Sequence, residues 1–421
     1  MNKKLFIDLL QNAALVILSV TAVLLMLQFP MLDGAISGRM HALLSSPESA
    51  PEKNFDLATA VTAVHFVVTD DYEYGRCTRI NASTSEAEFQ KIAPLFREAI
   101  GSAAEQKNAT ETEFRAALKS SGIYIDLTTV LPVSMVAAWL GEELVSDSNI
   151  RALALTTAQE TAMLYFLKED GSVVRCVSAL SSSGVREITV TFAPNGGRFA
   201  YETEYAALSP YTVMVQDVDA VAQIGAALPA GYSAYNLLTA LEFNAHTNSR
   251  YTESGGAEVV IQSPQILKIG PDGTVRYSSD GEVTNELYRV VSMGSEPTSA
   301  EVLQAACLLA NALSEGTNAA QLSFDGAEKT DDGWIILFCY RVGGIRVRLN
   351  EDRAALRVII TGDRIVEFEY YCRAYTTMQE TDALLPPSIA VAIAAMYEDA
   401  ELSIAYVDNG ASMMTARWFA Q

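Results

Sequence analysis

The residues most able to do chemistry are few and lie far apart in this sequence. The three histidines are His41, His65 and His246, and no two of them have the spacing that builds a metal site on a helix. No serine stands three residues before a lysine and no Gly-x-Ser-x-Gly motif is present, so the usual signatures of an activated serine are missing. We therefore predict that the chain is not an enzyme and that it uses no cofactor and no metal.

Adjacent acids offer a second kind of site. They occur at Asp70-Asp71, Glu142-Glu143, Asp331-Asp332 and Glu398-Asp399. A calcium loop needs alternating oxygen ligands and a distal glutamate, and none of these pairs has that spacing. We interpret the pairs as solvated acids at turns, with a carboxylate dyad as the alternative.

The cysteines are odd in number and widely spaced. They are Cys77, Cys176, Cys307, Cys339 and Cys372. Because no Cys-x-x-Cys pair is present, the spacing favours neither a disulfide framework nor zinc, and a single disulfide stays open as an alternative. Cys372 falls on the apolar face of an expected strand, where a cysteine usually packs as a small apolar side chain.

Charge and composition limit the classes of partner. The chain has 421 residues and 50% apolar content, which is enough for two or three separate cores. Its net charge of -22 excludes a nucleic-acid partner, because phosphate contacts need clustered Lys and Arg and the 29 bases here are scattered among 51 acids. The same acidity disfavours binding along an anionic lipid surface, so membrane attachment requires a dedicated segment.

Residues 9–29 form that segment, because these 21 residues carry no charge. As a helix that rises 1.5 Å per residue, they span a hydrocarbon core of about 30 Å. Lys3 and Lys4 precede the segment and Asp33 follows it, so the positive-inside rule places the N-terminus in the cytoplasm and the bulk of the chain outside. The alternative is a cleaved signal peptide, since the densest apolar run, residues 13–27, is short; the bulk is exported in either case.

One face of this helix is suited to contact another membrane helix. In a heptad pattern that face consists of Leu10, Ala14, Ile17, Thr21, Leu24 and Gln28. Small residues let two helices approach closely, and a polar side chain can hydrogen-bond across them for about 1 kcal/mol. We predict these six as partner contacts. The alternative is that Thr21 bonds its own backbone and Gln28 lies at the membrane surface.

Composition and turn residues divide the whole chain into six ranges. We predict a cytoplasmic tip at 1–8, a transmembrane helix at 9–29, a tether at 30–54, and α+β domains at 55–210, 211–295 and 296–421. The tether is expected because residues 41–54 hold two prolines and three serines. In the first domain we expect helices at 86–100 and 112–120 and a hairpin of 162–167 with 173–177. The fold class is therefore α+β, with antiparallel sheets and packed helices.

The middle domain is expected to contain a helix at 234–243 and a hairpin of 259–269 with 274–277. The last domain is expected to begin with a helix capped by Thr298 or Ser299 and ended by Gly316. An antiparallel meander of 334–342, 345–349, 356–360 and 365–373 should follow, then a helix at 387–397 and a hairpin of 402–406 with 413–419.

Alternation in the fourth meander strand defines a polar face. We place Val366, Phe368, Tyr370 and Cys372 on the apolar face and Ile365, Glu367, Glu369, Tyr371 and Arg373 on the polar face. Tyr371 and Tyr375 are then aromatic residues on a polar face, which makes them our candidates for external contacts. The alternative for both is core packing.

Several short motifs, together with this order of elements, resemble those of a known family. They are the Lys3-Lys4 tip before one membrane helix, the strand Glu369-Tyr370-Tyr371-Cys372-Arg373-Ala374-Tyr375, the Leu384-Leu385-Pro386 turn before a helix, and the closing Ala405-Tyr406-Val407-Asp408 and Arg417-Trp418-Phe419. With them the chain resembles the YycH/YycI family of two-component-system regulatory proteins, and in length the YycH branch. The resemblance implies extracytoplasmic domains related to PepSY modules, with a PepSY-like C-terminal domain.

The resemblance also implies a function. The family regulates a sensor histidine kinase that governs cell-wall metabolism in Gram-positive bacteria. Its membrane helix contacts the kinase's membrane helices, and its external domains associate with a related membrane-anchored regulator, so a homo- or hetero-oligomer in the cell membrane is expected. An alternative from another class is a tethered extracytoplasmic binding or protease-inhibitory module unrelated to a kinase.

Overall fold

The computed structural model describes the larger part of the chain after residue 64. The described residues are 65–73, 76–81, 86–142, 144, 148–157, 160–202, 210–214, 220–281, 285–292, 296–350, 353–394, 396, 402–410 and 412–420. By its contacts the chain divides into two units, Met1–Phe55 and Asp56–Gln421. The tip, the transmembrane helix and the tether expected at 1–54 lie outside the described residues, and no helix within the described ranges is both long and apolar enough to cross a membrane.

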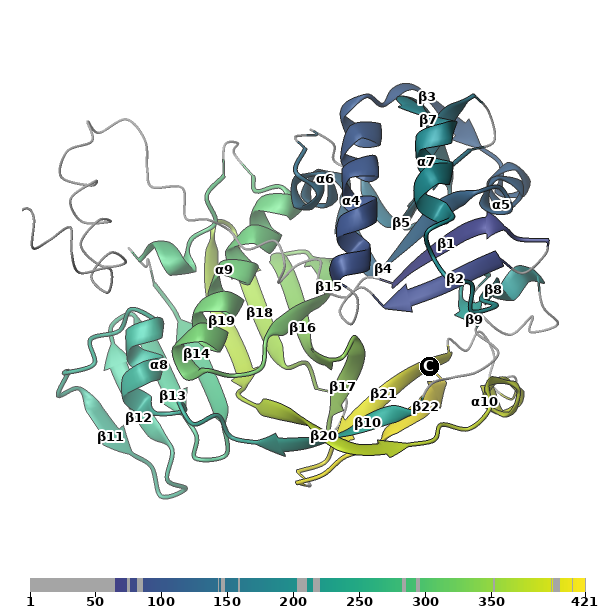
Figure 1. Cartoon of the computed structure of the whole chain (residues 1–421). Coiled ribbons are helices and arrows are strands. Elements are labelled where there is room, and N and C mark those ends of the chain that lie inside the picture. Colours follow the sequence, from purple (N-terminus) through teal and green to yellow (C-terminus); the bar gives the residue numbers. More distant parts are fainter. Residues whose placement is uncertain are drawn as a thin grey trace, which may run out of the picture. The chain divides into compact units, whose positions relative to one another are not determined.

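A seven-stranded antiparallel sheet forms the first part of the described structure (Figure 1). Its strands, in spatial order, are β2 (Arg76–Asn81), β1 (His65–Asp71), β4 (Gly122–Pro132), β5 (Asn149–Thr156), β6 (Thr161–Lys168), β7 (Val173–Ser181) and β3 (Ala104–Ala109). The helices are α4 (Glu86–Gly101), α5 (Glu111–Leu118), α6 (Val133–Leu140) and α7 (Ser182–Thr189). The hairpin expected at 162–167 and 173–177 is confirmed as β6 and β7, and both helices expected here are confirmed.

Both faces of this sheet are covered, which explains why β6 is apolar along its length. Phe114 and Leu118 of α5 pack with Tyr124, Tyr165 and other residues of one face. Helices α4, α6 and α7 lie along the other face (Figure 1). Because neither face meets water, six consecutive residues of β6 are buried, and strict alternation is absent.

An eleven-stranded sheet contains most of the remaining strands. Its order is β11 (Arg250–Thr252), β12 (Glu258–Gln262), β13 (Gln265–Ile269), β14 (Thr274–Ser279), β19 (Arg364–Tyr371), β18 (Leu356–Thr361), β16 (Gly333–Val342), β17 (Ile345–Leu349), β21 (Leu402–Asp408) and β22 (Ala416–Ala420), with β15 (Leu322–Thr330) paired to β16. The strands thus come from both predicted ranges 211–295 and 296–421, and they join where β14 pairs with β19. The α+β class is confirmed; the six-range division stays a prediction.

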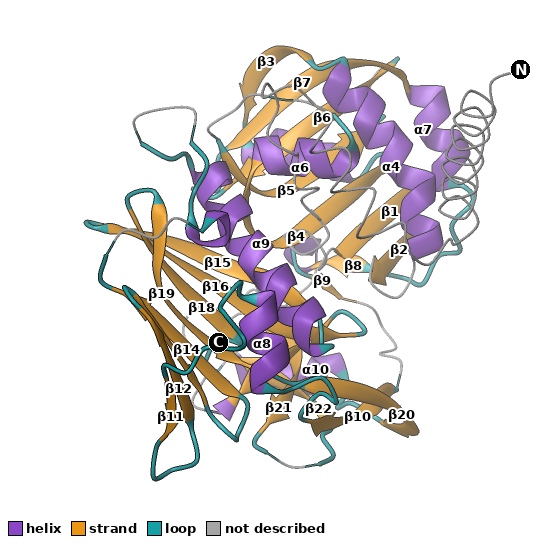
Figure 2. Cartoon of the chain, turned by 90° about the vertical axis from the view of Figure 1, so that its left-hand side faces the viewer, coloured by secondary structure: helices purple, strands orange, loops and turns teal. Residues whose placement is uncertain are grey.

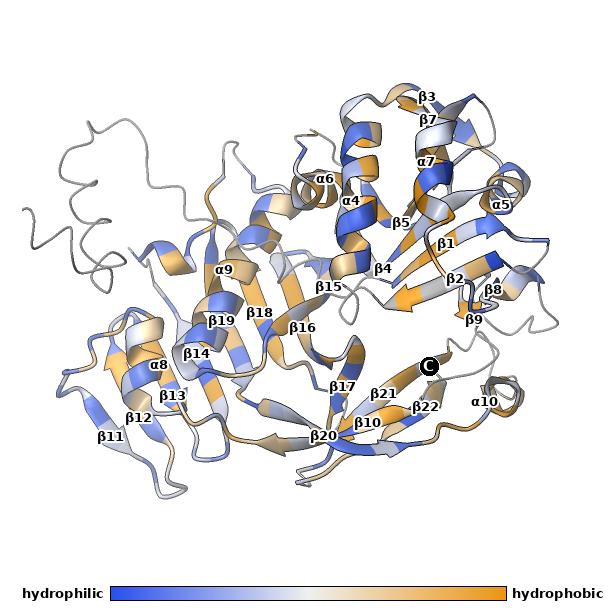
Figure 3. Cartoon of the chain, in the orientation of Figure 1, coloured by the Kyte–Doolittle hydropathy of each residue, from blue (hydrophilic) through white to orange (hydrophobic). Residues whose placement is uncertain are grey.

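Helices α8 (Ala234–Ala240) and α9 (Ser299–Thr317) lie across one face of this sheet (Figure 2). Helix α9 shows both hydrophilic and hydrophobic segments in Figure 3, as expected for a helix that covers a sheet with one side. Its N-cap is Thr298, whose hydroxyl accepts from the Glu301 N–H at 3.3 Å while its own N–H donates to the Glu301 carboxylate at 2.8 Å. The structure thus selects Thr298 over Ser299.

The expectation that Gly316 ends α9 is wrong. The helix continues to Thr317, and Asn318 forms the C-cap in the left-handed conformation, with φ of 53°. A β-carbon at Gly316 would overlap the β-carbon of Ala240 on α8. Gly316 therefore allows the two helices to approach closely, and Asn supplies the left-handed cap.

The eleven-stranded sheet corrects three other expectations, of which the first two concern single strands. Residues 259–269 are two strands, β12 and β13, because the chain turns at Ser263-Pro264. The register of β18 and β19 shifts so that Ile360 pairs with Ile365, which places Ile365 in the core at 0% exposure and leaves Val366 half-buried. A bulge of this kind adds one residue to a strand and reverses the alternation that we expected on its first residues.

The third correction concerns the antiparallel meander. Strand β18 pairs with β16 and not with its predecessor β17, which pairs instead with β21 in parallel. The chain reaches β21 through β20 (Ala374–Asp382) and helix α10 (Pro387–Ala394), and a parallel pair needs such a long crossover. Strand β20 pairs with β10 (Val221–Ala227) in a separate two-stranded sheet. Smaller elements are β8 (Arg198–Phe199), β9 (Val213–Met214) and the 3-10 turns Ala200–Glu202 and Glu286–Tyr288.

Candidate interaction surfaces

Tyr371 lies on the polar face of β19, in a network of charged side chains. Its hydroxyl donates to the Glu369 carboxylate at 2.9 Å, and Arg353 donates to the hydroxyl oxygen at 3.0 Å. Arg276 of β14 holds the same carboxylate through two of its nitrogens, at 2.7 and 2.6 Å. Partial burial raises the pKa of Glu369, but the hydrogen bonds from Arg276 and Tyr371 outweigh burial and lower this pKa below its usual value. Tyr371 is half-buried, and its hydroxyl is held by Glu369 of its own strand and by Arg353.

Tyr375 belongs to a different network. Its hydroxyl donates to the Asp408 carboxylate at 3.0 Å, and Arg373 approaches the same carboxylate at 3.5 Å. Asp408 is buried at the end of β21, where it also accepts the Gly410 N–H at 3.0 Å. Burial, and then the nearby Asp408 carboxylate, raise the pKa of Tyr375. The structure thus does not bring Tyr371 and Tyr375 into one patch, and both hydroxyls are engaged within the chain.

Helix α10 presents apolar side chains on two sides. Ala390, Val391 and Ala394 are buried and pack with Leu402, with Trp418 against them. Four large apolar residues in α10 or next to it are about half-exposed or more: Leu385 (51%), Ile389 (48%), Ile393 (48%) and Met396 (81%). Ile389 and Ile393 lie four residues apart on one face of α10, whereas Leu385 precedes the helix and Met396 follows it. A helix that is apolar on both sides has more apolar surface than its own sheet covers.

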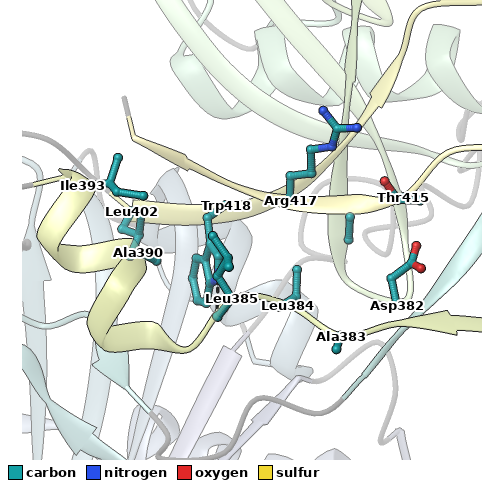
Figure 4. Close-up of a pocket in the computed structure, with 11 residues that line it drawn as sticks. Asp382, Ala383, Leu384, Leu385, Ala390, Ile393, Leu402, Thr415, Arg417 and Trp418 are labelled. Atoms are coloured by element: carbon teal, nitrogen blue, oxygen red, sulfur yellow. Dashed lines mark hydrogen bonds between the residues drawn. The ribbon is translucent and has the colours of Figure 1, made fainter.

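A groove runs beside this exposed face, between α10 and β22 (Figure 4). It has a volume of about 480 Å³, and Ile393 and Asp382 lie toward its opposite ends. Apolar side chains of Leu384, Leu385 and Trp418 line it, with Arg417 as a basic residue. The Trp418 indole N–H donates to the Leu385 carbonyl at 2.8 Å, which fixes the connection that leads into α10. We call Leu385, Ile389, Ile393, Met396 and this groove the α10 surface.

The sequence predicted the helix but not this surface. The signal was present, because residues 387–394 read Pro-Ser-Ile-Ala-Val-Ala-Ile-Ala and contain a single polar side chain. A helix that only covers a sheet alternates apolar and polar residues at the helical period. The absence of a polar face therefore indicates exposed apolar surface on this helix, whereas the sequence led us to predict contacts at Tyr371 and Tyr375.

The residues considered for catalysis do not converge. His65 lies in β1, and His246 is exposed with its ring 6.2 Å from that of Tyr235; His41 lies outside the described residues. Among the residues that the structure describes, no group of three or more His, Cys, Asp and Glu is placed to hold a metal ion. The six candidate contacts of the membrane helix, Leu10, Ala14, Ile17, Thr21, Leu24 and Gln28, also lie outside the described residues.

All five cysteines are free and buried, so the alternative of one disulfide is not realised. Burial raises the pKa of the Cys77 thiol to about 11 and that of Cys339 to about 12. The placement of Cys372 in the core is confirmed, and its thiol donates to the Thr317 hydroxyl at 3.4 Å. All five thiols are thus shielded from solvent, and burial also raises the pKa of the Cys176 and Cys372 thiols.

We expect none of the five thiols to react with a disulfide reagent at about pH 8 while the chain is folded, because the thiolate is the reactive form and burial disfavours it. All five should react once the chain is unfolded in concentrated guanidinium. Counting the thiolate released by Ellman's reagent in the two states checks this. Rapid reaction of one thiol in the folded chain would contradict the burial described here.

The comparisons with known proteins address the fold. No protein-family model matches the chain, and no curated protein matches it in sequence. Among solved structures, the chain is similar to the crystal structure of YycH from Bacillus subtilis, with a TM-score of 0.52 and 10% sequence identity. The similarity covers 86% of this chain and 94% of that one. At this identity the likeness concerns architecture, and it confirms the resemblance noted from short sequence motifs: the chain has a YycH-like fold.

Proposed function

We propose that this chain is a membrane-anchored extracytoplasmic regulator of a sensor histidine kinase that responds to the state of the cell wall. The observation that carries the proposal is the YycH-like fold over 86% of the chain, together with the uncharged segment at residues 9–29. The fold extends over nearly the whole length of the similar protein, so the likeness is not limited to one common module.

In this proposal the chain acts by binding one signalling state of the kinase more tightly than another. A ligand shifts an equilibrium only by its difference in affinity for the two states, and a typical coupling is about 1 to 3 kcal/mol. The predicted helix face from Leu10 to Gln28 would contact the kinase's membrane helices, and the external unit would associate with a related membrane-anchored regulator. No cofactor or metal is required.

A crosslinking pull-down from native membranes tests the proposal. The full-length chain is compared with a variant whose residues 9–29 are replaced by a polyleucine helix of the same length, which keeps the anchor and removes the small and polar side chains. We expect the first to recover a sensor histidine kinase and the second to recover at most about a tenth as much, the loss that corresponds to about 1.4 kcal/mol. Recovery of no kinase by either, or of the same exported protein by both, would favour a passively tethered binding module instead.

A further inference from the structure

The eleven-stranded sheet has an open edge at β11. Strand β11 pairs with β12 on one side and is the last strand of the sheet on the other, at its outer end (Figure 1). The Ser249 carbonyl accepts the Ile261 N–H at 2.9 Å, and the Glu253 N–H donates to the Ala257 carbonyl at 2.8 Å. Residues 249–253 therefore all run along β12, and all of them except Glu253 are exposed.

Every second residue of this segment has hydrogen-bonding groups on the open side. In an antiparallel pair, the N–H and carbonyl groups of successive residues point alternately toward the partner strand and away from it. Since Ser249 and Glu253 bond to β12, the N–H and carbonyl groups of Arg250 and Thr252 point away from β12. A sheet adds a further strand through such groups, so an extended segment fits this edge.

The end strands of the two large sheets differ in how well they are closed. In β3 of the seven-stranded sheet, the register shifts between Ala104 and Lys107, and Glu105 has a φ of 52°. An irregular strand with an exposed lysine resists pairing with another chain. Strand β11 pairs regularly with β12, and its one charged residue, Arg250, forms an ion pair with Glu258 at 3.4 Å. The edge at β11 is therefore the one that a further strand can join.

We infer that two copies of this chain pair through β11, as antiparallel strands related by a two-fold axis at Tyr251. Arg250 then lies opposite Thr252 of the second copy, so the free N–H and carbonyl groups of both residues gain partners. A register that sets Arg250 opposite itself would oppose two like charges, which destabilises a strand pair. A shift in the other direction sets Tyr251 opposite Glu253 and separates the two tyrosines. This contact is independent of the proposed kinase contact, which is assigned to the membrane helix.

Apolar side chains on one face of the sheet favour the same register. Tyr251 is 53% exposed, and Ile261 and Ile266 on the next two strands are 42% and 43% exposed. Ile261 pairs with Ile266, and Tyr251 pairs with Val259, two residues before Ile261, so the three exposed side chains share one face. Pairing at Tyr251 continues this row into the second copy and sets two tyrosines at a non-hydrogen-bonded position, where side chains are closest. An unrelated extended segment would gain the backbone hydrogen bonds without this match.

Disulfide crosslinking of the full-length chain in native membranes tests the pairing. The Cα atoms of a non-hydrogen-bonded pair are about 4.5 Å apart, which a disulfide can span. We expect Tyr251→Cys to give a disulfide-linked homodimer under mild oxidation, because the five native cysteines are buried and do not compete. The matched control is Thr252→Cys, since in this register the two Thr252 Cα atoms lie beyond the limit of about 7 Å and should give at most about a tenth of that yield.

A second substitution tests the hydrogen bonds of the open edge. Thr252→Pro, added to Tyr251→Cys, removes an N–H that points away from β12 and should lower the dimer yield about tenfold while β11 stays in its sheet. Circular dichroism of each purified variant checks the fold. The pairing is overturned if Tyr251→Cys gives no dimer or links to a different protein, if Thr252→Cys gives the same yield, or if Thr252→Pro leaves the yield unchanged.

Discussion

Replacing Gly333 with alanine should destabilise the folded unit by about 3 to 5 kcal/mol. Gly333 begins β16 with φ of 155°, a backbone conformation that residues other than glycine rarely adopt. A β-carbon there would overlap the carbonyl oxygen of Ile360 on the paired strand β18. Since a backbone atom is unable to move aside as a side chain does, the β16–β18 pairing itself would have to shift, in the centre of the eleven-stranded sheet. Chemical denaturation followed by circular dichroism measures the loss.

Gly326→Ala provides the matched control. Gly326 lies in β15, paired to the same strand β16, and a β-carbon there would meet nothing within 4 Å. We expect a change of at most about 1 kcal/mol, with stabilisation as the expected sign, because alanine restricts the unfolded chain more than glycine does. Equal effects of Gly326→Ala and Gly333→Ala would show that the close approach of Gly333 to Ile360 does not determine stability.

Phe368→Ala should cost about 3 to 5 kcal/mol, the range for removing a large aromatic side chain from a core. Phe368 is 1% exposed and its ring is stacked on that of Tyr277, with 5.1 Å between centroids. Tyr277 stacks in turn on Tyr288 at 4.5 Å. Tyr277 and Phe368 are paired residues of β14 and β19, so the substitution removes packing that joins the two parts of the large sheet.

Hydrogen exchange read by mass spectrometry gives this prediction a spatial test. We expect Phe368→Ala to speed exchange in β14 and in β19 alike, although the two strands are about 90 residues apart in sequence. Phe368→Leu keeps most of the apolar volume and should cause a clearly smaller change. Faster exchange confined to residues 296–421 would indicate that the ranges 211–295 and 296–421 unfold as independent domains.

Local chemistry explains which parts of the fold could be predicted from the sequence. The hairpin of β6 and β7 and the final hairpin of β21 and β22 were predicted because turn residues and alternation act over a few positions. The N-terminus of α9 was predicted for the same reason, since the capping box of Thr298 and Glu301 is written in four consecutive residues.

Pairing between distant strands was not predictable in this way. The parallel contact of β17 with β21 and the junction of β14 with β19 depend on how helices cover the sheet, which no short window contains. The shifted register between β18 and β19 turns Ile365 into the core. The alternation of residue types around Ile365 contains no sign of this shift. Gly316 was misread because glycine serves helix ends and close helix contacts alike.

The candidate site was predicted only in part. Tyr371 and Tyr375 were expected from alternation to face outward, and the structure instead places their hydroxyls in two intrachain networks with Glu369 and Asp408. Glu369 lies two residues from Tyr371 on the same face of β19, whereas Asp408 comes from β21, a strand distant in sequence. The α10 surface was within reach of the sequence, because residues 387–394 have no polar face to turn toward water.

The central claim is that this chain regulates a kinase, and the most direct test is a rate. The sensor kinase recovered from native membranes would be reconstituted in lipid bilayers alone, with the full-length chain, and with the polyleucine variant of residues 9–29. We predict that the full-length chain changes the rate of kinase autophosphorylation by about fivefold or more, in either direction, and that the variant changes it much less. An autophosphorylation rate that is the same with and without the full-length chain would contradict the account.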